Sequence, residues 1–397
     1  MKQTYKPASL DDVRDIIKDA LANETSLSIT GSGSKSGLGY MSNPEADLQL
    51  QDMSGIVAYE PEELILVART GTSLSEIETL LADNNQMLSF EPFHPQAVYG
   101  AESSGTIGGM VAAGLSGPRR IASGGIRDYL LGFTAVSGRG DFFQSGSRVM
   151  KNVTGYDLSK LMAGSFGSLA VMDEITLKVL PAPETSCSLV VACADIAGAQ
   201  TVCSQAFGSA HEPTAAAILP PDIASLAGLG DTHIRALIRL EGVEVSVNDR
   251  VAKLQDMLKT HGKVDIIPTD ASKSIWSQIR DAAFLPHEAE QTWKISIPPT
   301  ACSDVLSHLK NYEISSFMDW AGGLIWLAGS GATLGDDIRA ALAKTNGGHA
   351  TLMRAPDHLR QTVPVFQPQA AALAALQSRI RNAFDPKSVL NPGRMGT

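Results

Sequence analysis

The chain has 397 residues, of which 44% are hydrophobic and 19% charged, and its formal net charge is −10. This length predicts two or three domains, and the composition is typical of a folded protein with a substantial core. An acidic balance without a long lysine or arginine run excludes nucleic acid as the expected partner. Because no segment has the roughly 18 uninterrupted apolar residues that span a bilayer, and no signal-peptide core begins the chain, we expect a cytoplasmic protein that meets a membrane only peripherally, through partners.

The chain begins with a pattern that predicts a helix. Val13, Ile16 and Ile17 share one helical face after Ser9, and Ser9 with Asp12 resembles a capping box. A short strand at 26–30 then leads directly into a glycine- and serine-rich loop at 31–37. Strands at 47–50, 55–60 and 64–70 and a helix at 72–83 follow. The alternation of short strands and helices predicts mixed α/β structure.

The loop at 31–37 is the first candidate binding element. Backbone amides in such a loop form a concavity for an anion, and its serine hydroxyls and Lys35 add donors. It lacks the glycine before Lys35 that a phosphate-binding GxxxxGK[ST] loop requires, and no helix pattern follows at once. A solvent-exposed serine–glycine loop is the alternative interpretation.

Glycine is concentrated in the middle of the first half: fifteen of the 36 glycines lie between Gly100 and Gly167. Glycine permits close backbone approach and positive φ, so this segment predicts main chain packed against a ligand. Two of its turns, at 106–114 and 164–171, could contact the same ligand as the loop at 31–37. Tight helix packing and a plain turn into a strand are the alternatives. Within the segment, 131–137 and 142–143 predict a hairpin.

Metal and disulfide chemistry are not indicated. The four cysteines (Cys187, Cys193, Cys203 and Cys302) contain no CxxC pair, so we expect reduced thiols. The eight histidines show neither HxH nor HExxH spacing, so no metal site is expected.

Prolines at 181 and 183 mark a domain boundary. Beyond them, strand and helix patterns alternate up to about residue 350, which predicts a second α/β layer, and no internal repeat is visible. We therefore expect one domain at 1–181, a second at 184–350, and a C-terminal segment at 351–397.

Two motifs carry a resemblance to a known family. The sequence KNVTGYDLSKLMAGSFGSL at 151–169 and the ending FDPKSVLNPGR at 384–394 resemble the flavin-binding domain of the vanillyl-alcohol oxidase/p-cresol methylhydroxylase (PCMH) superfamily. Within it, the chain is most similar to the family of smaller flavin-binding subunits of bacterial glycolate oxidase. The resemblance implies an α+β, two-domain PCMH-type FAD-binding fold with an α/β, ferredoxin-like cap. The FAD-binding domain would be 1–181, the cap on the substrate side 184–350, and the C-terminal segment 351–397 would return to the FAD-binding domain.

The resemblance also implies residue roles, with FAD as the cofactor. One set would hold the pyrophosphate or lie along the dinucleotide: Gly31, Ser32, Gly33, Ser34, Lys35, Thr106, Gly108, Gly109 and Gly117. A second set would line the adenosine or ribityl side: Gly164, Ser165, Gly167, Leu169 and Val171. Asn391 and Arg394 would approach the isoalloxazine. The loops lack the His or Cys of covalent flavoproteins, so we expect non-covalent FAD, with His94 the one candidate against it.

The sequence does not identify the residues that would oxidise the substrate. Related 2-hydroxyacid dehydrogenases carry a histidine-rich strand, whereas the corresponding segment 323–332 has neither histidine nor acid. Oxidation of an α-hydroxyl needs a base for the proton and a cation for the carboxylate. His349 and Arg354 are candidates by chain order, with structural roles as the favoured alternative, so the catalytic residues stay unassigned.

The resemblance therefore implies a component of a glycolate oxidase (dehydrogenase) complex that converts glycolate, a small 2-hydroxy acid, to glyoxylate. A second flavin subunit and an iron–sulfur subunit would be its partners. A stand-alone FAD-dependent dehydrogenase of another hydroxyl substrate, and a non-catalytic FAD-binding assembly or relay subunit, are the alternatives.

Overall fold

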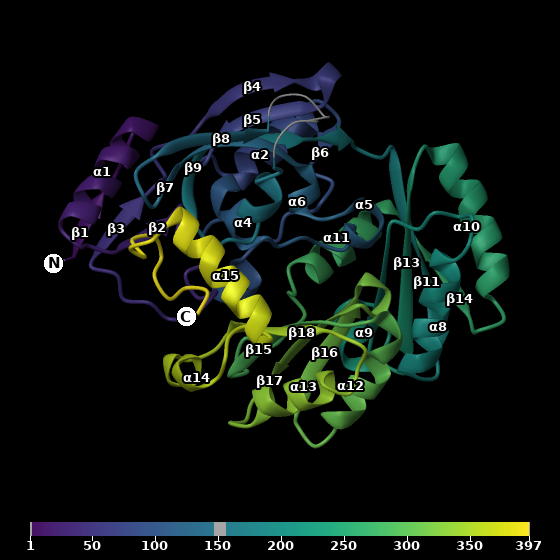
Figure 1. Cartoon of the computed structure of the whole chain (residues 1–397). Coiled ribbons are helices and arrows are strands. Elements are labelled where there is room, and N and C mark those ends of the chain that lie inside the picture. Colours follow the sequence, from purple (N-terminus) through teal and green to yellow (C-terminus); the bar gives the residue numbers. More distant parts are fainter. Residues whose placement is uncertain (1, 147–155, 397) are drawn as a thin grey trace. The chain divides into compact units, whose positions relative to one another are not determined.

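The computed structural model describes residues 2–146 and 156–396, which form two units (Figure 1). The first unit comprises residues 1–116, 124–181 and 368–397, and the second comprises 117–123 and 182–367. The chain passes between them after Pro181, at the prolines that the sequence marks. The returning C-terminal segment begins at 368 rather than at the expected 351, because the strand at 349–354 pairs within the second unit.

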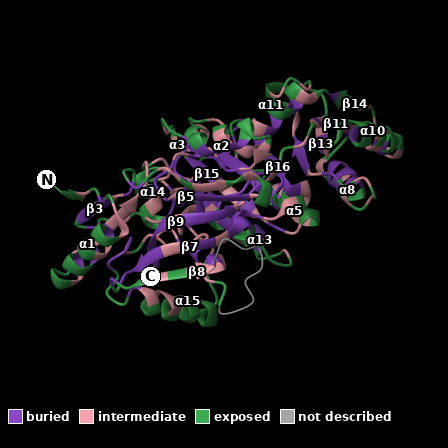
Figure 2. Cartoon of the chain, turned by 90° about the horizontal axis from the view of Figure 1, so that it is seen from above, coloured by how far each residue is buried: buried purple, intermediate pink, exposed green. Residues whose placement is uncertain are grey.

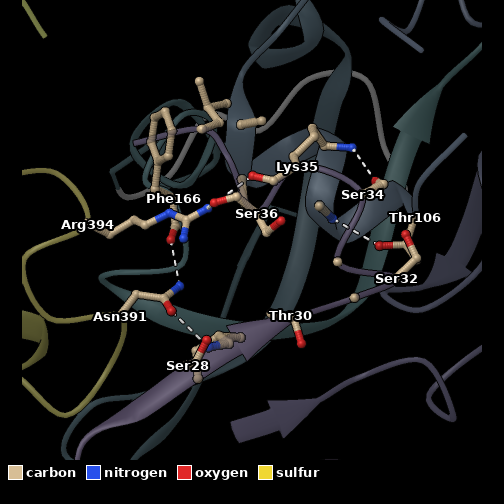
Figure 3. A pocket seen from close by; sticks show the side chains of 17 residues that line it. Ser28, Thr30, Ser32, Ser34, Lys35, Ser36, Thr106, Phe166, Asn391 and Arg394 are labelled. Atoms are coloured by element: carbon tan, nitrogen blue, oxygen red, sulfur yellow. Dashed lines mark hydrogen bonds between the residues drawn. The ribbon is translucent and has the colours of Figure 1, made fainter. Parts of the chain in front are cut away.

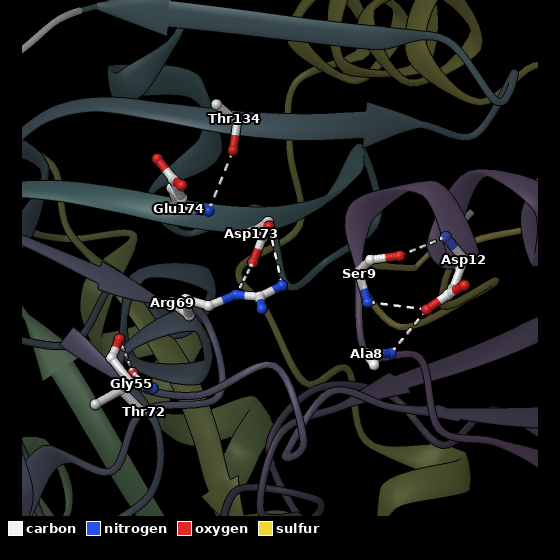
Figure 4. Close-up of polar contacts among 9 residues, drawn as sticks. All are labelled: Ala8, Ser9, Asp12, Gly55, Arg69, Thr72, Thr134, Asp173 and Glu174. Atoms are coloured by element: carbon white, nitrogen blue, oxygen red, sulfur yellow. Dashed lines mark hydrogen bonds and ion pairs between the residues drawn. The ribbon is translucent and has the colours of Figure 1, made fainter. Parts of the chain in front are cut away.

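A small parallel sheet begins the first unit, with strand order β1-β3-β2. Its strands are β1 (Gln3–Tyr5), β2 (Leu27–Thr30) and β3 (Ala46–Gln49). Helix α1 (Leu10–Ala22) buries Val13 and Ile17 in the same core as Leu27 and Leu390. Ser9 caps α1: its hydroxyl accepts a hydrogen bond from the Asp12 amide at 3.1 Å, and the Asp12 carboxylate accepts one from the Ser9 amide at 2.9 Å (Figure 4). The predicted capping box is confirmed.

A five-stranded antiparallel sheet follows, in the order β4-β5-β9-β7-β8. Its strands are β4 (Ile56–Glu60), β5 (Ile65–Arg69), β7 (Leu130–Ser137), β8 (Phe142–Gly146) and β9 (Ala170–Lys178). The β7–β8 pair is the predicted hairpin. Arg69 and Asp173 join β5 to β9 through two hydrogen bonds of 2.9 and 3.2 Å, a bidentate pair that holds the middle of the sheet (Figure 4).

Shorter elements complete the first unit. They are α2 (Leu74–Asp83), α3 (Gln96–Tyr99), α4 (Ile107–Ala113), α6 (Ile126–Tyr129), α7 (Ser159–Met162), α15 (Ala371–Phe384), the two-residue strands β6 (Gln86–Met87) and β10 (Leu180–Pro181), and a 3₁₀ turn at Pro61–Glu63. Burial is concentrated on the sheet strands, whereas α15 has no buried residue (Figure 2).

The second unit contains an eight-stranded antiparallel sheet in the order β14-β11-β13-β12-β16-β17-β15-β18. Its strands are β11 (Thr185–Cys193), β12 (Ala215–Leu219), β13 (Ile234–Gly242), β14 (Val264–Ile267), β15 (Gln291–Ser296), β16 (Ile314–Asp319), β17 (Leu324–Gly329) and β18 (His349–Arg354). The helices are α5 (Arg120–Ser123), α8 (Ile196–Phe207), α9 (Pro221–Leu226), α10 (Glu244–Leu258), α11 (Thr269–Arg280), α12 (Cys302–His308), α13 (Leu334–Leu342) and α14 (Asp357–Thr362), with 3₁₀ turns at Pro299–Ala301 and Trp320–Gly322.

This sheet is built from two copies of one topology. The elements β11-α8-β12-β13-α10-β14 and β15-α12-β16-β17-α13-β18 each follow a β-α-β-β-α-β order, with α9 and the 3₁₀ turn at Trp320–Gly322 inserted between the second and third strands. Within each copy the first and third strands are central, and the copies join through β12 and β16. This is a ferredoxin-like arrangement used twice. The topology is therefore repeated although the sequence shows no internal repeat.

Candidate functional site

A cavity of about 140 Å³ in the first unit brings several predicted residues together (Figure 3). Its walls come from the end of β2, the loop after it, the start of α4, a turn at Phe166 and the C-terminal tail. The lining residues are Ser28, Ile29, Thr30, Gly31, Ser32, Gly33, Ser34, Lys35, Ser36, Leu38, Thr106, Gly109, Ala112, Ala113, Phe166, Asn391 and Arg394. This volume suits a phosphate-sized part of a ligand, since whole ligand pockets usually measure about 300–1,000 Å³.

Gly31 has no room for a side chain. A Cβ there would lie 2.3 Å from the Thr106 hydroxyl oxygen, so the loop can approach the start of α4 only through a glycine. Thr106 is the N-cap of α4 and accepts a hydrogen bond from the Gly109 amide at 3.2 Å. The two glycine-rich segments that the sequence singled out therefore meet at Gly31 and Thr106.

Lys35 carries the strongest electrostatic signal in the cavity. Burial lowers the pKa of its ammonium group to about 8. Within residues 2–146 and 156–396, its one hydrogen bond is a long contact of 3.5 Å to the Ser34 hydroxyl, and no carboxylate pairs with it. A partly desolvated cation without a counter-ion is costly to the folded state. An anionic ligand would remove that cost.

Ser32 gives independent evidence for a ligand. Its hydroxyl oxygen is buried and has no hydrogen-bond partner in the described part of the chain. Buried polar atoms in folded proteins are nearly always hydrogen-bonded. An oxygen-rich group such as a pyrophosphate would satisfy both the Ser32 hydroxyl and Lys35, so the residues present fit the phosphate part of a dinucleotide.

The C-terminal tail closes one side of this cavity. Asn391 accepts a hydrogen bond from the Ile29 amide and donates one to the Phe166 carbonyl, both at 2.8 Å (Figure 3). Arg394 donates to the carbonyls of Lys35 and Ser36, both at 3.0 Å. These hydrogen bonds fix the tail to the loop at 31–37, so Asn391 and Arg394 shape the cavity through the backbone groups that they contact. Their predicted approach to the isoalloxazine stays a prediction.

Seven predicted residues do not line the cavity, and tight packing explains most of their positions. A Cβ on Gly108 would lie 1.8 Å from the Thr70 hydroxyl oxygen, and one on Gly167 would lie 2.8 Å from Asn391 Nδ2. Gly164 donates to the Val111 carbonyl at 3.0 Å, next to Ser165, while Leu169 and Val171 are buried at the start of β9. Gly117 belongs to the second unit, where its carbonyl accepts a hydrogen bond from Trp320.

Sequence reasoning missed several lining residues. Ser28, Ile29 and Thr30 of β2 all line the cavity, whereas the sequence singled out only the loop that follows this strand. Phe166 has a φ of +56°, and this left-handed turn directs its carbonyl to Asn391. No sequence signal marks an aromatic residue for that conformation. Residues 151–155 of the family-like motif lie outside the described part of the chain.

The other candidates have structural contacts. His94 Nε2 lies 3.1 Å from the Glu78 carboxylate and does not line the cavity. Arg354 donates to the carbonyls of His287 and Ala289, at 2.9 and 3.0 Å, which accounts for it as a support of that loop. The four cysteines are free thiols, and the residues with coordinates contain no cluster of His, Cys, Asp and Glu suited to a metal ion.

Known proteins resemble both the sequence and the fold. Residues 1–146 match the family described as an FAD binding domain. Over 392 residues the chain is 36% identical to the glycolate oxidase subunit GlcE of Escherichia coli strain K12, covering 98% of this chain and 97% of that protein. The chain belongs to the GlcE family. It is also 24% identical to a D-lactate dehydrogenase of Anaerostipes hadrus, covering 98% and 88% of the two chains.

The solved structure of p-cresol methylhydroxylase with substrate bound has a TM-score of 0.74 to this chain, with 14% identity and coverage of 99% and 88%. The expected α+β, PCMH-type fold is thereby confirmed. No helix within the described ranges is long and apolar enough to cross a membrane.

Proposed function

We propose that this chain is the FAD-binding subunit of a glycolate oxidase (dehydrogenase) complex and that it holds FAD non-covalently. Bound FAD supplies a hydride acceptor, and oxidation of glycolate to glyoxylate removes one hydride from carbon and one proton from the hydroxyl. The observation that carries the proposal is Lys35, a half-buried ammonium without a counter-ion in a cavity of glycines and hydroxyls.

Each part of the cavity has a role in this proposal. Lys35 balances the negative charge of the pyrophosphate, and the Ser32 hydroxyl and loop amides donate hydrogen bonds to it. Asn391 and Arg394 hold the loop in its binding conformation. The lining residues include no histidine and no carboxylate, so this cavity binds cofactor and leaves proton removal to other groups.

The partners follow from what the chain lacks. Strand β17 (Leu324–Gly329) is fully buried and carries no histidine or acid. This favours a complex in which a second flavin subunit carries the fuller hydroxyacid site and an iron–sulfur subunit takes the electrons. The complex would lie in the cytoplasm and reach a membrane only through its partners. The same observation favours the second candidate function, an FAD-binding subunit that serves relay or assembly alone.

Two measurements test this function. Denaturing the purified chain and separating protein from small molecules should release FAD into solution; flavin that stays with the protein would contradict non-covalent binding. Glycolate-dependent dye reduction should be absent with the chain alone and present when the partners are co-expressed. Turnover by the chain alone would support a stand-alone dehydrogenase. Turnover of the complex that survives removal of this subunit's FAD would support an assembly role.

A further inference from the structure

A second lysine, in the other unit, shares the unusual electrostatics of Lys35. Lys294 lies on β15, and burial together with the nearby charge of Arg120 lowers the pKa of its ammonium group to about 8. Within residues 2–146 and 156–396, its Nζ makes no hydrogen bond and no ion pair within 4 Å. The ring of Trp320 lies close to it, with the ring centroid 5.1 Å from Nζ.

Trp320 is held in place as a flat platform. Its indole N–H donates to the Gly117 carbonyl at 3.0 Å, and its amide donates to the Asp319 carboxylate at 2.7 Å. Trp320 and Ala321 both have positive φ, +53° and +57°. Two consecutive non-glycine residues in the left-handed region are strained, and such strain is concentrated at functional sites.

Further charges surround this platform, all within the second unit. The guanidinium of Arg120, an exposed residue, lies 4.5 Å from the centroid of the Trp320 ring. Partial burial of the His349 ring, with Lys294 and Arg120 nearby, lowers the pKa of His349 below its usual value of 6.5 and so favours its neutral form. Asp319 is the carboxylate that acts on Lys294. Two cations and one carboxylate leave one positive charge in excess.

We propose that Lys294, with Arg120 beside it, binds the carboxylate of a small monocarboxylic acid against Trp320. One excess positive charge matches a monoanion, and a charge-assisted hydrogen bond from Nζ would satisfy an ammonium group that has no other acceptor. That the acid is a 2-hydroxy acid or its 2-oxo product rests on the proposed function; the anion site itself does not.

The probe is oxamate, a monocarboxylate without an oxidisable hydroxyl, titrated into the purified full-length chain by calorimetry and by tryptophan fluorescence. We expect saturable binding that weakens about 10-fold or more in Lys294→Gln and a few-fold in Arg120→Gln, because each removes a charge near the carboxylate. Lys294→Arg should retain binding. Lys310→Gln, at an exposed lysine of the same unit, is the matched control and should bind as the unchanged chain does.

Glycolamide, which is neutral, and inorganic phosphate should both bind more weakly than oxamate. Equal binding of phosphate would overturn the assignment to monocarboxylates. No oxamate binding by the unchanged chain, or equal binding by Lys294→Gln, would overturn the site. Thermal melting checks that each variant folds; should Lys294→Gln fail to fold, exposed Arg120 supplies the deciding variant. The visible flavin spectrum is read from the same samples. A chain without flavin would contradict the proposed function, whereas the oxamate titration tests the anion site independently.

Discussion

Two lysines, one in each unit, face the same electrostatic problem in different surroundings. Burial lowers the pKa of both Lys35 and Lys294 to about 8, and neither forms an ion pair in the described structure. Lys35 lies among glycines and hydroxyls, which are donors suited to phosphate oxygens. Lys294 lies against an indole ring, near Arg120 and His349, which suits one small carboxylate.

Three buried or half-buried arginines, unlike the two lysines, each have a carboxylate as counter-ion. Arg69 pairs with Asp173, and Glu241 is bonded by Arg119 at 2.8 Å and Arg239 at 3.2 Å. At these three arginines a carboxylate balances the positive charge. The two lysines therefore mark places where stability is lower than it could be, as is expected of binding sites.

The largest expected effect is loss of bound flavin from the cavity that contains Lys35. Gly31→Val would place a branched side chain where a Cβ alone comes within 2.3 Å of the Thr106 hydroxyl oxygen. The loop and the start of α4 would be forced apart, and we expect almost complete loss of bound flavin. The measurement is the ratio of flavin to protein absorbance after gel filtration.

Gly100→Ala is the matched control for that variant. Gly100 has a φ of +64° but open space around its Cβ position, and it does not line the cavity. It should cost about 1 kcal/mol of stability through backbone strain and leave the flavin ratio unchanged. If Gly31→Val retained its flavin, the meeting of Gly31 and Thr106 would not be part of the cofactor site.

The next effect tests the carboxylate-paired cations. Glu241→Ala leaves Arg119 and Arg239 without their shared carboxylate and should lower the free energy of unfolding by about 3–5 kcal/mol, measured by urea denaturation. Asp256→Ala, which breaks the exposed pair with Lys259, should be nearly neutral. If Glu241→Ala and Asp256→Ala lowered the free energy of unfolding equally, the carboxylate would not stabilise the buried arginines, and their contrast with the two lysines would not hold.

Glu241 also predicts a pH dependence. Burial alone would raise the pKa of its carboxyl, but Arg239 and Arg119 outweigh this and hold it below its usual value of 4.5. The charged pair therefore contributes fully above pH 4.5, and its contribution is lost as pH falls through the lower folded-state pKa. The stability difference between the unchanged chain and Glu241→Gln should shrink on acidification below that value.

The last effect concerns both lysines. Their folded-state pKa of about 8 lies below the ordinary value of 10.5, so the unfolded chain binds more protons between these values. The penalty of each charged lysine is thus fully present below pH 8 and disappears as pH rises to 10.5. In flavin-free protein, the unchanged chain should gain stability across this window relative to a Lys35→Gln, Lys294→Gln double variant. Parallel melting curves would contradict the lowered pKa values.

Local patterns predicted much of the fold. The Ser9 cap, the hairpin β7–β8 and the break after Pro181 depend on neighbouring residues, and all three were visible in the sequence. The second unit's doubled topology was not, because the two halves share strand order without sharing residues. Residues 117–123 belong to the second unit through contacts distant in sequence, such as Arg119 with Glu241.

The sequence likewise predicted only part of the candidate site. The loop at 31–35, Thr106 and the tail at Asn391 were identified because glycine turns and the family-like motif mark them. Glycine content alone cannot separate a ligand contact from close packing, which is why Gly108 and Gly167 lie against Thr70 and Asn391 instead. The group around Lys294 (Arg120, Lys294, Asp319, Trp320 and His349) is assembled from four separate segments, so no local sequence pattern predicted it.

The flavin-to-protein ratio of Lys35→Gln beside Lys294→Gln tests the account most directly, because the two variants remove the same charge from the two kinds of surroundings. If Lys35 binds the FAD pyrophosphate, the ratio should fall about 10-fold or more in Lys35→Gln at limiting FAD. It should stay at the level of the unchanged chain in Lys294→Gln. A Lys35→Gln chain that keeps its flavin, or a Lys294→Gln chain that loses it, would contradict the assignment of the cofactor to the first lysine and of a separate anion to the second.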